Sequence, residues 1–230
     1  MRIDVLTLFP DIFDNLNSFS IIKKAIDSKK VKIKSHNLRE FAENSRKVDD
    51  YPYGGFTGMV IKIEPIDNCI EYLKKKNNYD EIIYLTPDGE LLNQKTSNYL
   101  STLKNIIIIC GHYKGIDHRV REHLVTKEIS IGDFVVSGGE LPAAVLCDSI
   151  VRLLPGIIGD ESSALSDTFQ DNVLSPPIYT RPEVYKGMQV PKVLLSGNEK
   201  EIQKWNDEKS IERTKSVSYT HLTLPTILLV

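Results

Sequence analysis

The chain has 230 residues, of which 41% are hydrophobic and 26% are charged, and its formal net charge is −2 at pH 7. This composition is ordinary for a globular protein with a proper core, and the near-neutral charge argues against a protein that coats nucleic acid. Three cysteines without CxxC spacing and five histidines without HxxxH spacing argue against a structural metal site. We expect a cytoplasmic protein outside the membrane, because no signal peptide opens the chain and no apolar run approaches roughly 18 residues.

Apolar strands and helices alternate through the first half of the chain. Residues 3–9 predict a strand, and Asp11 is expected to cap the helix that follows. Further elements are predicted as strands at 31–38, 81–85 and 106–109 and as helices at 65–76 and 93–103. Strands and helices at these intervals indicate a parallel α/β sheet.

A long polar segment, residues 42–59, interrupts this alternation. Its aromatic residues Tyr51, Tyr53 and Phe56 lie among basic residues and glycines, a mixture suited to stacking on nucleic-acid bases. An ordinary surface loop is the alternative interpretation.

Two glycine-bearing segments follow apolar strands and predict a ligand site. The strand at 106–109 runs into Gly111 and Gly115, and a second pattern runs from Ile129 to Gly138-Gly139. We expect both loops to leave neighbouring strands, with the turn at 86–89 at the same edge, as in ligand sites of open α/β folds. The alternative is that these glycines merely turn the chain. Neither segment is GxGxxG or GxxxxGK[ST], so the sequence does not support a dinucleotide site, and the missing P-loop excludes a GTPase.

The second half of the chain changes character after an apolar helix predicted at 141–154. Residues 158–177 are polar and predict a flexible linker at a domain boundary. Residues 178–215 predict a small second module, with Trp205 as its anchor and a helix at about 199–215. We interpret residues 216–230 as a non-native tail, because they switch abruptly to an uncharged sequence.

Seven stretches in this order resemble the bacterial tRNA guanine-N1 methyltransferases that modify guanosine 37, the TrmD family of the SPOUT superfamily. The resemblance covers residues 1 to about 215 and is carried by LTLFPDIF, VDDYPYGG, YLTPDG, CGHYKGID, SIGDFVVSGGELPA, DSIVRLLPG and SPPIYTRPEVYKGMQVPKVLLSGN.

The resemblance implies an α/β fold with a deep C-terminal trefoil knot, a rare exception to unknotted topology. It implies a catalytic domain at 1–157, the linker at 158–177 and a helical tRNA-binding domain at 178–215, truncated before the tail at 216–230. It further implies S-adenosylmethionine as methyl donor, an obligate homodimer and binding to the anticodon branch of tRNA. The family is also associated with Mg²⁺, for which this sequence shows no ligand set.

By the same resemblance, the cofactor pocket draws on three segments. Its residues would be Tyr84, Leu85, Thr86, Pro87, Gly111, Tyr113, Ile131, Gly132, Asp133, Phe134, Val135, Val136, Gly138 and Gly139. Asp167 matches the family's general base, and Arg152 matches the arginine at the reacting guanine. Taken alone, Asp167 is typical of a helix N-cap and Arg152 of a charge at a helix end.

The sequence departs from the family pattern at two places. Phe56-Thr57 stands where the family usually has a third glycine followed by proline or alanine, and Lys114 replaces a glutamate. Since a lysine would not favour the positive charge of the donor, Lys114 is left out of the predicted pocket. Two alternatives to the implied activity are a catalytically silent RNA-binding module and a related knotted methylase with another RNA target.

Overall fold

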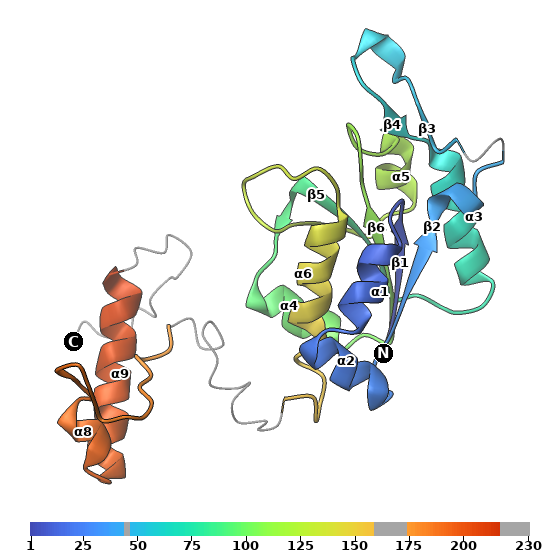
Figure 1. Cartoon of the computed structure of the whole chain (residues 1–230). Helices are drawn as coiled ribbons and strands as arrows, with labels where there is room; N and C mark the ends of the chain where they lie inside the picture. The colour runs from blue at the N-terminus through green and yellow to red at the C-terminus, as the bar shows by residue number, and fades with distance from the viewer. Residues whose placement is uncertain (44–46, 159–173, 217–230) are drawn as a thin grey trace, which may run out of the picture. The chain divides into compact units, whose positions relative to one another are not determined.

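The computed structural model describes residues 1–43, 47–158 and 174–216. The chain divides into two compact units, Met1–Gly159 and Asp160–Val230 (Figure 1). Within the described ranges, no helix is both long enough and apolar enough to cross a bilayer.

The first unit is built on a five-stranded parallel sheet with strand order β2-β1-β6-β5-β7. The strands are β1 (Arg2–Thr7), β2 (Lys32–Asn37), β5 (Glu81–Leu91), β6 (Asn105–Cys110) and β7 (Lys127–Ser130). The isoleucine run of β6 is fully buried at the centre of the sheet, as expected for a strand covered on both faces. The predicted parallel α/β fold is confirmed, whereas the implied knot stays a prediction.

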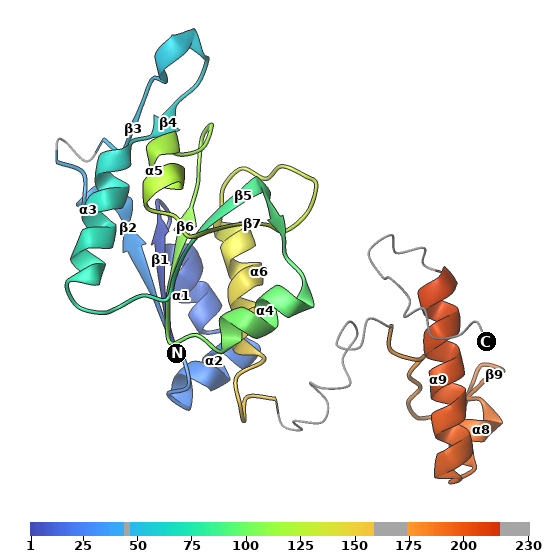
Figure 2. The same ribbon diagram turned by 180° about the vertical axis from the view of Figure 1, so that it is seen from behind.

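Helices cover both faces of this sheet. The helices are α1 (Asp11–Asn17), α2 (Ser20–Asp27), α3 (Ile63–Lys74), α4 (Gln94–Ser101), α5 (His118–His123) and α6 (Glu140–Val151). Ile106 and Ile108 pack in one apolar cluster with residues of α1, α2, α4 and α6, whereas Ile107 and Ile109 pack in another with residues of α3 and α5. Figures 1 and 2 show α4 and α6 on the side of the sheet away from α3.

The start of the chain differs from the sequence prediction. One helix was expected from Asp11, but two short helices form, and Phe19 between them is extended. The predicted Asp11 cap is wrong, because Pro10 is the N-cap residue and no side chain caps the helix. The Ser18 hydroxyl donates to the Asn15 carbonyl oxygen at 2.7 Å, a local bond that competes with continuation of the helix.

Three other features were not predicted. The strands β6 and β7 that carry the glycine loops are not neighbours, because β5 lies between them. The predicted turn at 86–89 lies inside β5, where the pairing with β7 shifts between Leu85 and Glu90. The segment at 42–59 is closed by an antiparallel pair, β3 (Asp49–Asp50) with β4 (Val60–Ile61), and two 3₁₀ turns lie at Leu38–Glu40 and Tyr53–Gly55.

The described part of the second unit, residues 174–216, contains a short hairpin and two helices. These elements are β8 (Val184–Tyr185), β9 (Met188–Gln189), α8 (Lys192–Leu195) and α9 (Glu199–Ser216). Trp205 is half-buried, and its ring centroid lies 6.4 Å from that of Tyr179. Among the described residues of this unit only Leu174 and Thr214 are buried, and the Leu174 N–H donates to the Thr214 hydroxyl at 2.9 Å. The described part of this unit therefore has little apolar core of its own.

A buried carboxylate in β1 holds three neighbouring polar groups. Asp4 has no exposed side-chain surface, and it accepts hydrogen bonds from Arg2, His36 and Tyr79. His36 Nε2 and the Tyr79 hydroxyl each lie 2.7 Å from a carboxylate oxygen. Burial by itself would raise the pKa of Asp4, but the hydrogen bonds from His36, Arg2 and Tyr79 outweigh it and lower the pKa to about 2.

We predict that Asp4→Asn destabilises the protein at neutral pH and that much of this loss disappears in acid. Because the folded-state pKa lies below the ordinary value of 3.8, the ionised carboxylate stabilises the fold above about pH 4 and loses this effect as the pH falls towards 2. The contribution is about 2 kcal/mol. Urea denaturation of both proteins between pH 7 and pH 2 measures it. A difference in unfolding free energy that stays constant over this range would contradict the prediction.

Candidate functional site

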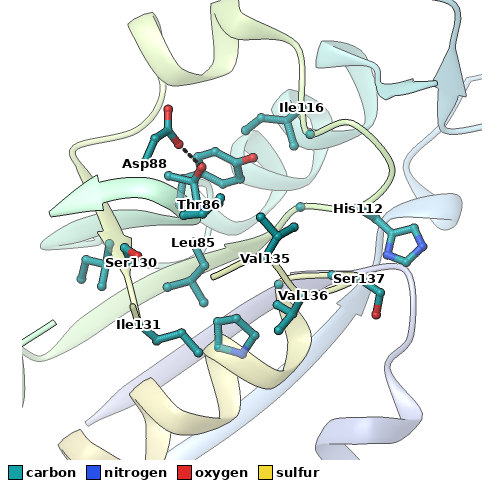
Figure 3. A pocket seen from close by; sticks show the side chains of 18 of the residues that line it. Leu85, Thr86, Asp88, His112, Ile116, Ser130, Ile131, Val135, Val136 and Ser137 are labelled. Atoms are coloured by element: carbon teal, nitrogen blue, oxygen red, sulfur yellow. Dashed lines mark hydrogen bonds between the residues drawn. The ribbon is translucent and has the colours of Figure 1, made fainter. Parts of the chain in front are cut away.

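Three loops at the carboxyl edge of the sheet enclose a cavity of about 450 Å³. They are the irregular turn inside β5, the loop after β6 and the loop between β7 and α6. The labelled side chains in Figure 3 come from all three of them. Parallel strands deliver their carboxyl ends to one edge, which is where ligand crevices form in open α/β sheets. The sheet thus brings together segments that lie far apart in the sequence.

The loops after β6 and β7 touch through their backbones. The Gly139 N–H donates to the Gly111 carbonyl oxygen at 2.8 Å, and His112 forms an antiparallel bridge with Gly138. A Cβ at Gly139 would lie 2.7 Å from Cys110 Cα and 2.8 Å from Gly111 N, so only glycine allows this approach. The contact fixes the start of α6 against the end of β6.

The first turn of α6 carries a buried carboxylate next to this contact. The Glu140 side chain is almost fully buried, and the Thr7 hydroxyl at the end of β1 donates to its Oε1 at 2.7 Å. A negative charge at a helix N-terminus is favoured by the helix dipole. Glu140 therefore ties α6 to the carboxyl end of β1 beneath the cavity.

One wall of the cavity is crossed by a charged network. Arg121 of α5 donates to both carboxylate oxygens of Glu128 in β7, each at 2.6 Å, and to Asp88 at 2.9 Å. Asp88 also accepts a hydrogen bond from the Thr86 hydroxyl (Figure 3). The pKa of Asp88 is lowered by the hydrogen bonds from Thr86 and Arg121, so this carboxylate is ionised at neutral pH.

Tyr84 lies between this network and the loop after β6. Its ring faces the Arg121 guanidinium at 5.6 Å, and its hydroxyl lies 2.9 Å from the position that a Gly111 Cβ would occupy. Burial raises the pKa of Tyr84, with the nearby Arg121 charge acting against that rise, so the phenol stays protonated.

The aromatic segment at 42–59 is joined to the cavity loop by backbone hydrogen bonds. The Ile61 N–H donates to Gly115 O at 3.0 Å, the Asp117 N–H donates to Ile61 O at 2.9 Å, and the Lys114 N–H donates to Met59 O at 3.0 Å. The described part of this segment exposes three aromatic side chains: Tyr51 at 77%, Tyr53 at 95% and Phe56 at 76%.

The structure places almost all of the predicted cofactor residues around this cavity. The residues that line it are Tyr84, Leu85, Thr86, Pro87, Gly111, Tyr113, Ile131, Gly132, Phe134, Val135, Val136, Gly138 and Gly139. Asp133 does not line the cavity and is exposed. Arg152 is the C-cap residue of α6 and also lies off the cavity wall, and Asp167 falls outside the described residues.

Several lining residues were missed by the sequence analysis. Lys114, which was left out of the predicted pocket, lines the cavity, as do Asp88, His112 and Arg121. Asp88 was interpreted only as part of a turn, and Arg121 lies in a helix that was not predicted. Among the described residues, no group of three or more His, Cys, Asp or Glu side chains is arranged to hold a metal ion.

The chain matches a known protein family over nearly its whole length. The model of the family described as tRNA (Guanine-1)-methyltransferase TrmD matches residues 1–222. Two similar proteins, both named tRNA (guanine-N(1)-)-methyltransferase, come from Christiangramia forsetii and Bacteroides fragilis. They are 57% identical to this chain over 218 and 216 residues, which covers 94% of this chain and 96% of each relative.

A solved structure is similar as well. The crystal structure of tRNA (m1G37) methyltransferase from Aquifex aeolicus is 41% identical in sequence and matches with a TM-score of 0.79. The match covers 94% of this chain and 92% of that chain.

We predict that Gly139→Ala strongly destabilises the first unit. The added methyl group would press on backbone atoms of Cys110 and Gly111, which have no rotamer to change, so we expect a loss of about 2–3 kcal/mol in unfolding free energy. Gly55→Ala is the control, because Gly55 has φ +78° with open space around it and should lose only about 1–2 kcal/mol. Urea denaturation compares them. Equal losses would mean that the backbone contact tolerates a Cβ.

Proposed function

The chain belongs to the tRNA (guanine-N1)-methyltransferase family, and from this premise we propose that it transfers the methyl group of S-adenosylmethionine to N1 of guanosine 37 in tRNA. The observation that carries the proposal is the cavity enclosed by the three loops, around which nearly all of the residues expected to hold the donor gather. The Aquifex aeolicus protein, which is similar over almost the entire chain, is named for methylation at position 37. Because tRNA is the proposed substrate, we place the activity in the cytoplasm.

The residues around the cavity fit the proposed methyl donor. A volume of about 450 Å³ lies in the range of small-molecule sites. Leu85, Ile131 and Val136 offer apolar surface for a flat base, and the ionised Asp88 offers a carboxylate towards a cationic ligand. When bound, the donor supplies a methyl group on a positively charged sulfur, so the protein need not generate an electrophile.

The work of the protein lies on the acceptor side. Guanine N1 carries a proton and becomes nucleophilic only when that proton leaves and negative charge moves onto O6. We assign removal of the proton to Asp167 and stabilisation of the charge at O6 to Arg152. A positioned base contributes about 10²–10⁴-fold, and a preorganised donor at a developing charge contributes about 3–4 kcal/mol.

The position of Arg152 supports a site shared between two chains. Arg152 ends α6, whereas Glu140 at the start of the same 12-residue helix lies beside the cavity loops. A helix of this length spans about 18 Å, which separates Arg152 from the cavity of its own chain. Val135, Leu141 and Val145 expose 84%, 62% and 49% of their surface, an apolar area that suits pairing with a second copy. We therefore propose a homodimer in which one chain acts on the guanine beside the donor of the other.

The aromatic segment is proposed to contact the tRNA. Tyr51, Tyr53 and Phe56 present exposed rings on a hairpin that is hydrogen-bonded to the cavity loop. Protein aromatics stack on the unstacked bases of RNA loops. This placement favours the anticodon branch as the part of the tRNA that is bound.

Mass mapping tests the proposed activity directly. Bulk tRNA incubated with the protein and S-adenosylmethionine should gain one methyl group, located on the base of guanosine 37. Methylation of a ribose or of another nucleotide would identify a related methylase with a different target. Binding of tRNA without donor binding or methylation would identify a silent RNA-binding module.

We predict that Asp167→Asn lowers the rate of methyl transfer by at least about 10²-fold, because the amide cannot accept the N1 proton at neutral pH. Affinity for S-adenosylmethionine should barely change, since Asp167 is assigned to the acceptor and not to the donor. Single-turnover kinetics and calorimetry measure the two quantities. Near-normal turnover would remove Asp167 from the chemistry.

We predict that two inactive variants restore activity when they are mixed. Gly111→Val blocks the cavity, because a Cβ there would lie 2.9 Å from the Tyr84 hydroxyl, and Asp167→Ala removes the base. After joint unfolding and refolding, half of the dimers are mixed, and each mixed dimer has one intact and one doubly altered site. Activity should recover to roughly a quarter of wild type.

Native mass spectrometry supplies the control, because it counts the mixed dimers. Mixed dimers that remain as inactive as the separate variants would place the base and the donor loops of each site in a single chain.

A further inference from the structure

We propose that Arg121 is a positioning residue for the methyl donor. It clamps the irregular turn of β5, Thr86–Gly89, against β7, so that this turn forms a fixed wall of the cavity. The inference rests on the proposed function, because it takes the occupant of the cavity to be S-adenosylmethionine. It concerns α5 and its arginine, to which the proposed mechanism gives no role.

Arg121 is held by a rigid fork of contacts. Its Nε and Nη2 atoms bond the two oxygens of Glu128 at 2.6 Å each, and Nη2 also donates to Asp88 at 2.9 Å. The Arg121 side chain is only 23% exposed, which strengthens these charged hydrogen bonds relative to a fully exposed pair. One guanidinium thus joins three separate segments: α5, β7 and the turn inside β5.

The turn has few other means of holding its shape. Between Leu85 and Glu90 its residues do not pair with β7, because both of these residues are paired with Ile129. The Thr86 hydroxyl bonds to Asp88 within the turn itself, and Gly89 packs on the backbone of β7. Arg121 is the described side chain that ties Asp88 to the rest of the fold.

Removing Arg121 would leave two carboxylates near each other without their shared cation. Asp88, whose side chain is 61% exposed, would then be free to turn away from Glu128 towards solvent. The donor would have to order the Thr86–Gly89 turn on binding, and such ordering lowers affinity. The chemical step itself would be unaffected once the donor is in place.

The arginine is required for its shape as well as its charge. A lysine offers a single ammonium group and cannot form a two-pronged contact with Glu128 while it also bonds Asp88 in the same plane. Arg121→Lys should therefore restore only part of what Arg121→Gln loses.

The test compares donor binding and turnover in variants of the full chain. Arg121→Gln should raise the dissociation constant of S-adenosylmethionine about tenfold, the equivalent of one charge-assisted hydrogen bond. The rate at saturating donor and tRNA should stay within about twofold of wild type. Arg119→Gln is the matched control. Arg119 lies in the same helix, forms a two-pronged pair with Asp117, is 59% exposed and does not line the cavity, so donor affinity should stay unchanged.

Glu128→Gln separates clamping from direct contact. Glu128 does not line the cavity, so its substitution removes no direct contact with the donor but does loosen Arg121. We expect Glu128→Gln to weaken donor binding about threefold. The double variant Glu128→Gln, Arg121→Gln should bind the donor more tightly than the product of the two single effects predicts. This variant also keeps the proposal testable if Arg121→Gln does not fold.

S-adenosylhomocysteine separates clamping from simple electrostatics, because it lacks the methyl group and the positive charge. A loose wall weakens both ligands equally in Arg121→Gln. The proposal would be overturned if Arg121→Gln weakened binding of the cationic donor alone, or if it tightened binding of that donor. It would also be overturned if donor affinity were unchanged in both Arg121→Gln and Glu128→Gln, or if the rate at saturation fell while affinity stayed unchanged. A wild-type protein that binds neither ligand would overturn the proposed function as well.

Discussion

The close approach of two backbones, Gly139 to Cys110 and Gly111, is the constraint on which the rest of the site depends. A contact at this distance leaves no room for a side chain, and it joins the end of the central strand β6 to the first turn of α6. It brings the buried Glu140 to Thr7 at the end of β1. It also sets how far the loop between β7 and α6 stands from the loop after β6. A single backbone hydrogen bond thus joins two of the three loops that line the cavity.

Two charged side chains of the first unit, Asp4 and Arg121, are each held by several polar partners. Asp4 is surrounded by three donors, and Arg121 is surrounded by two carboxylates. Removing one partner from such a group leaves a poorly solvated charge, which is more damaging than the loss of an exposed pair. Both groups connect segments that are distant in sequence, so they fix the relative positions of strands and loops that apolar packing alone would leave adjustable.

Much of the fold could be predicted from the sequence, because it is encoded in local patterns. The isoleucine run at 106–109 indicates a strand covered on both faces, and the glycines at 111, 138 and 139 predict a ligand site in the loops that follow the strands. The comparisons confirm the resemblance to the methyltransferase family. That resemblance had implied thirteen of the residues that line the cavity. The order of the strands was not predictable in this way, because pairing of β5 between β6 and β7 depends on contacts between distant residues. For the same reason the sequence analysis missed the network of Arg121, Glu128 and Asp88, because no local pattern indicates that these three residues meet.

The pairing of β1 with β6 also means that the first strand is synthesised long before one of its two partners. Arg2 pairs with Asn105 and Leu6 pairs with Ile109, so the partner of the first strand is made about a hundred residues later. At roughly 5–20 residues per second, that interval is about 5–20 s. During it, β1 can pair only with β2, and an isolated pair of strands is marginally stable in water. The edge of β1 that β6 later covers therefore stays unpaired while about a hundred residues are added, and the cavity can close only after Gly139 has been made as well.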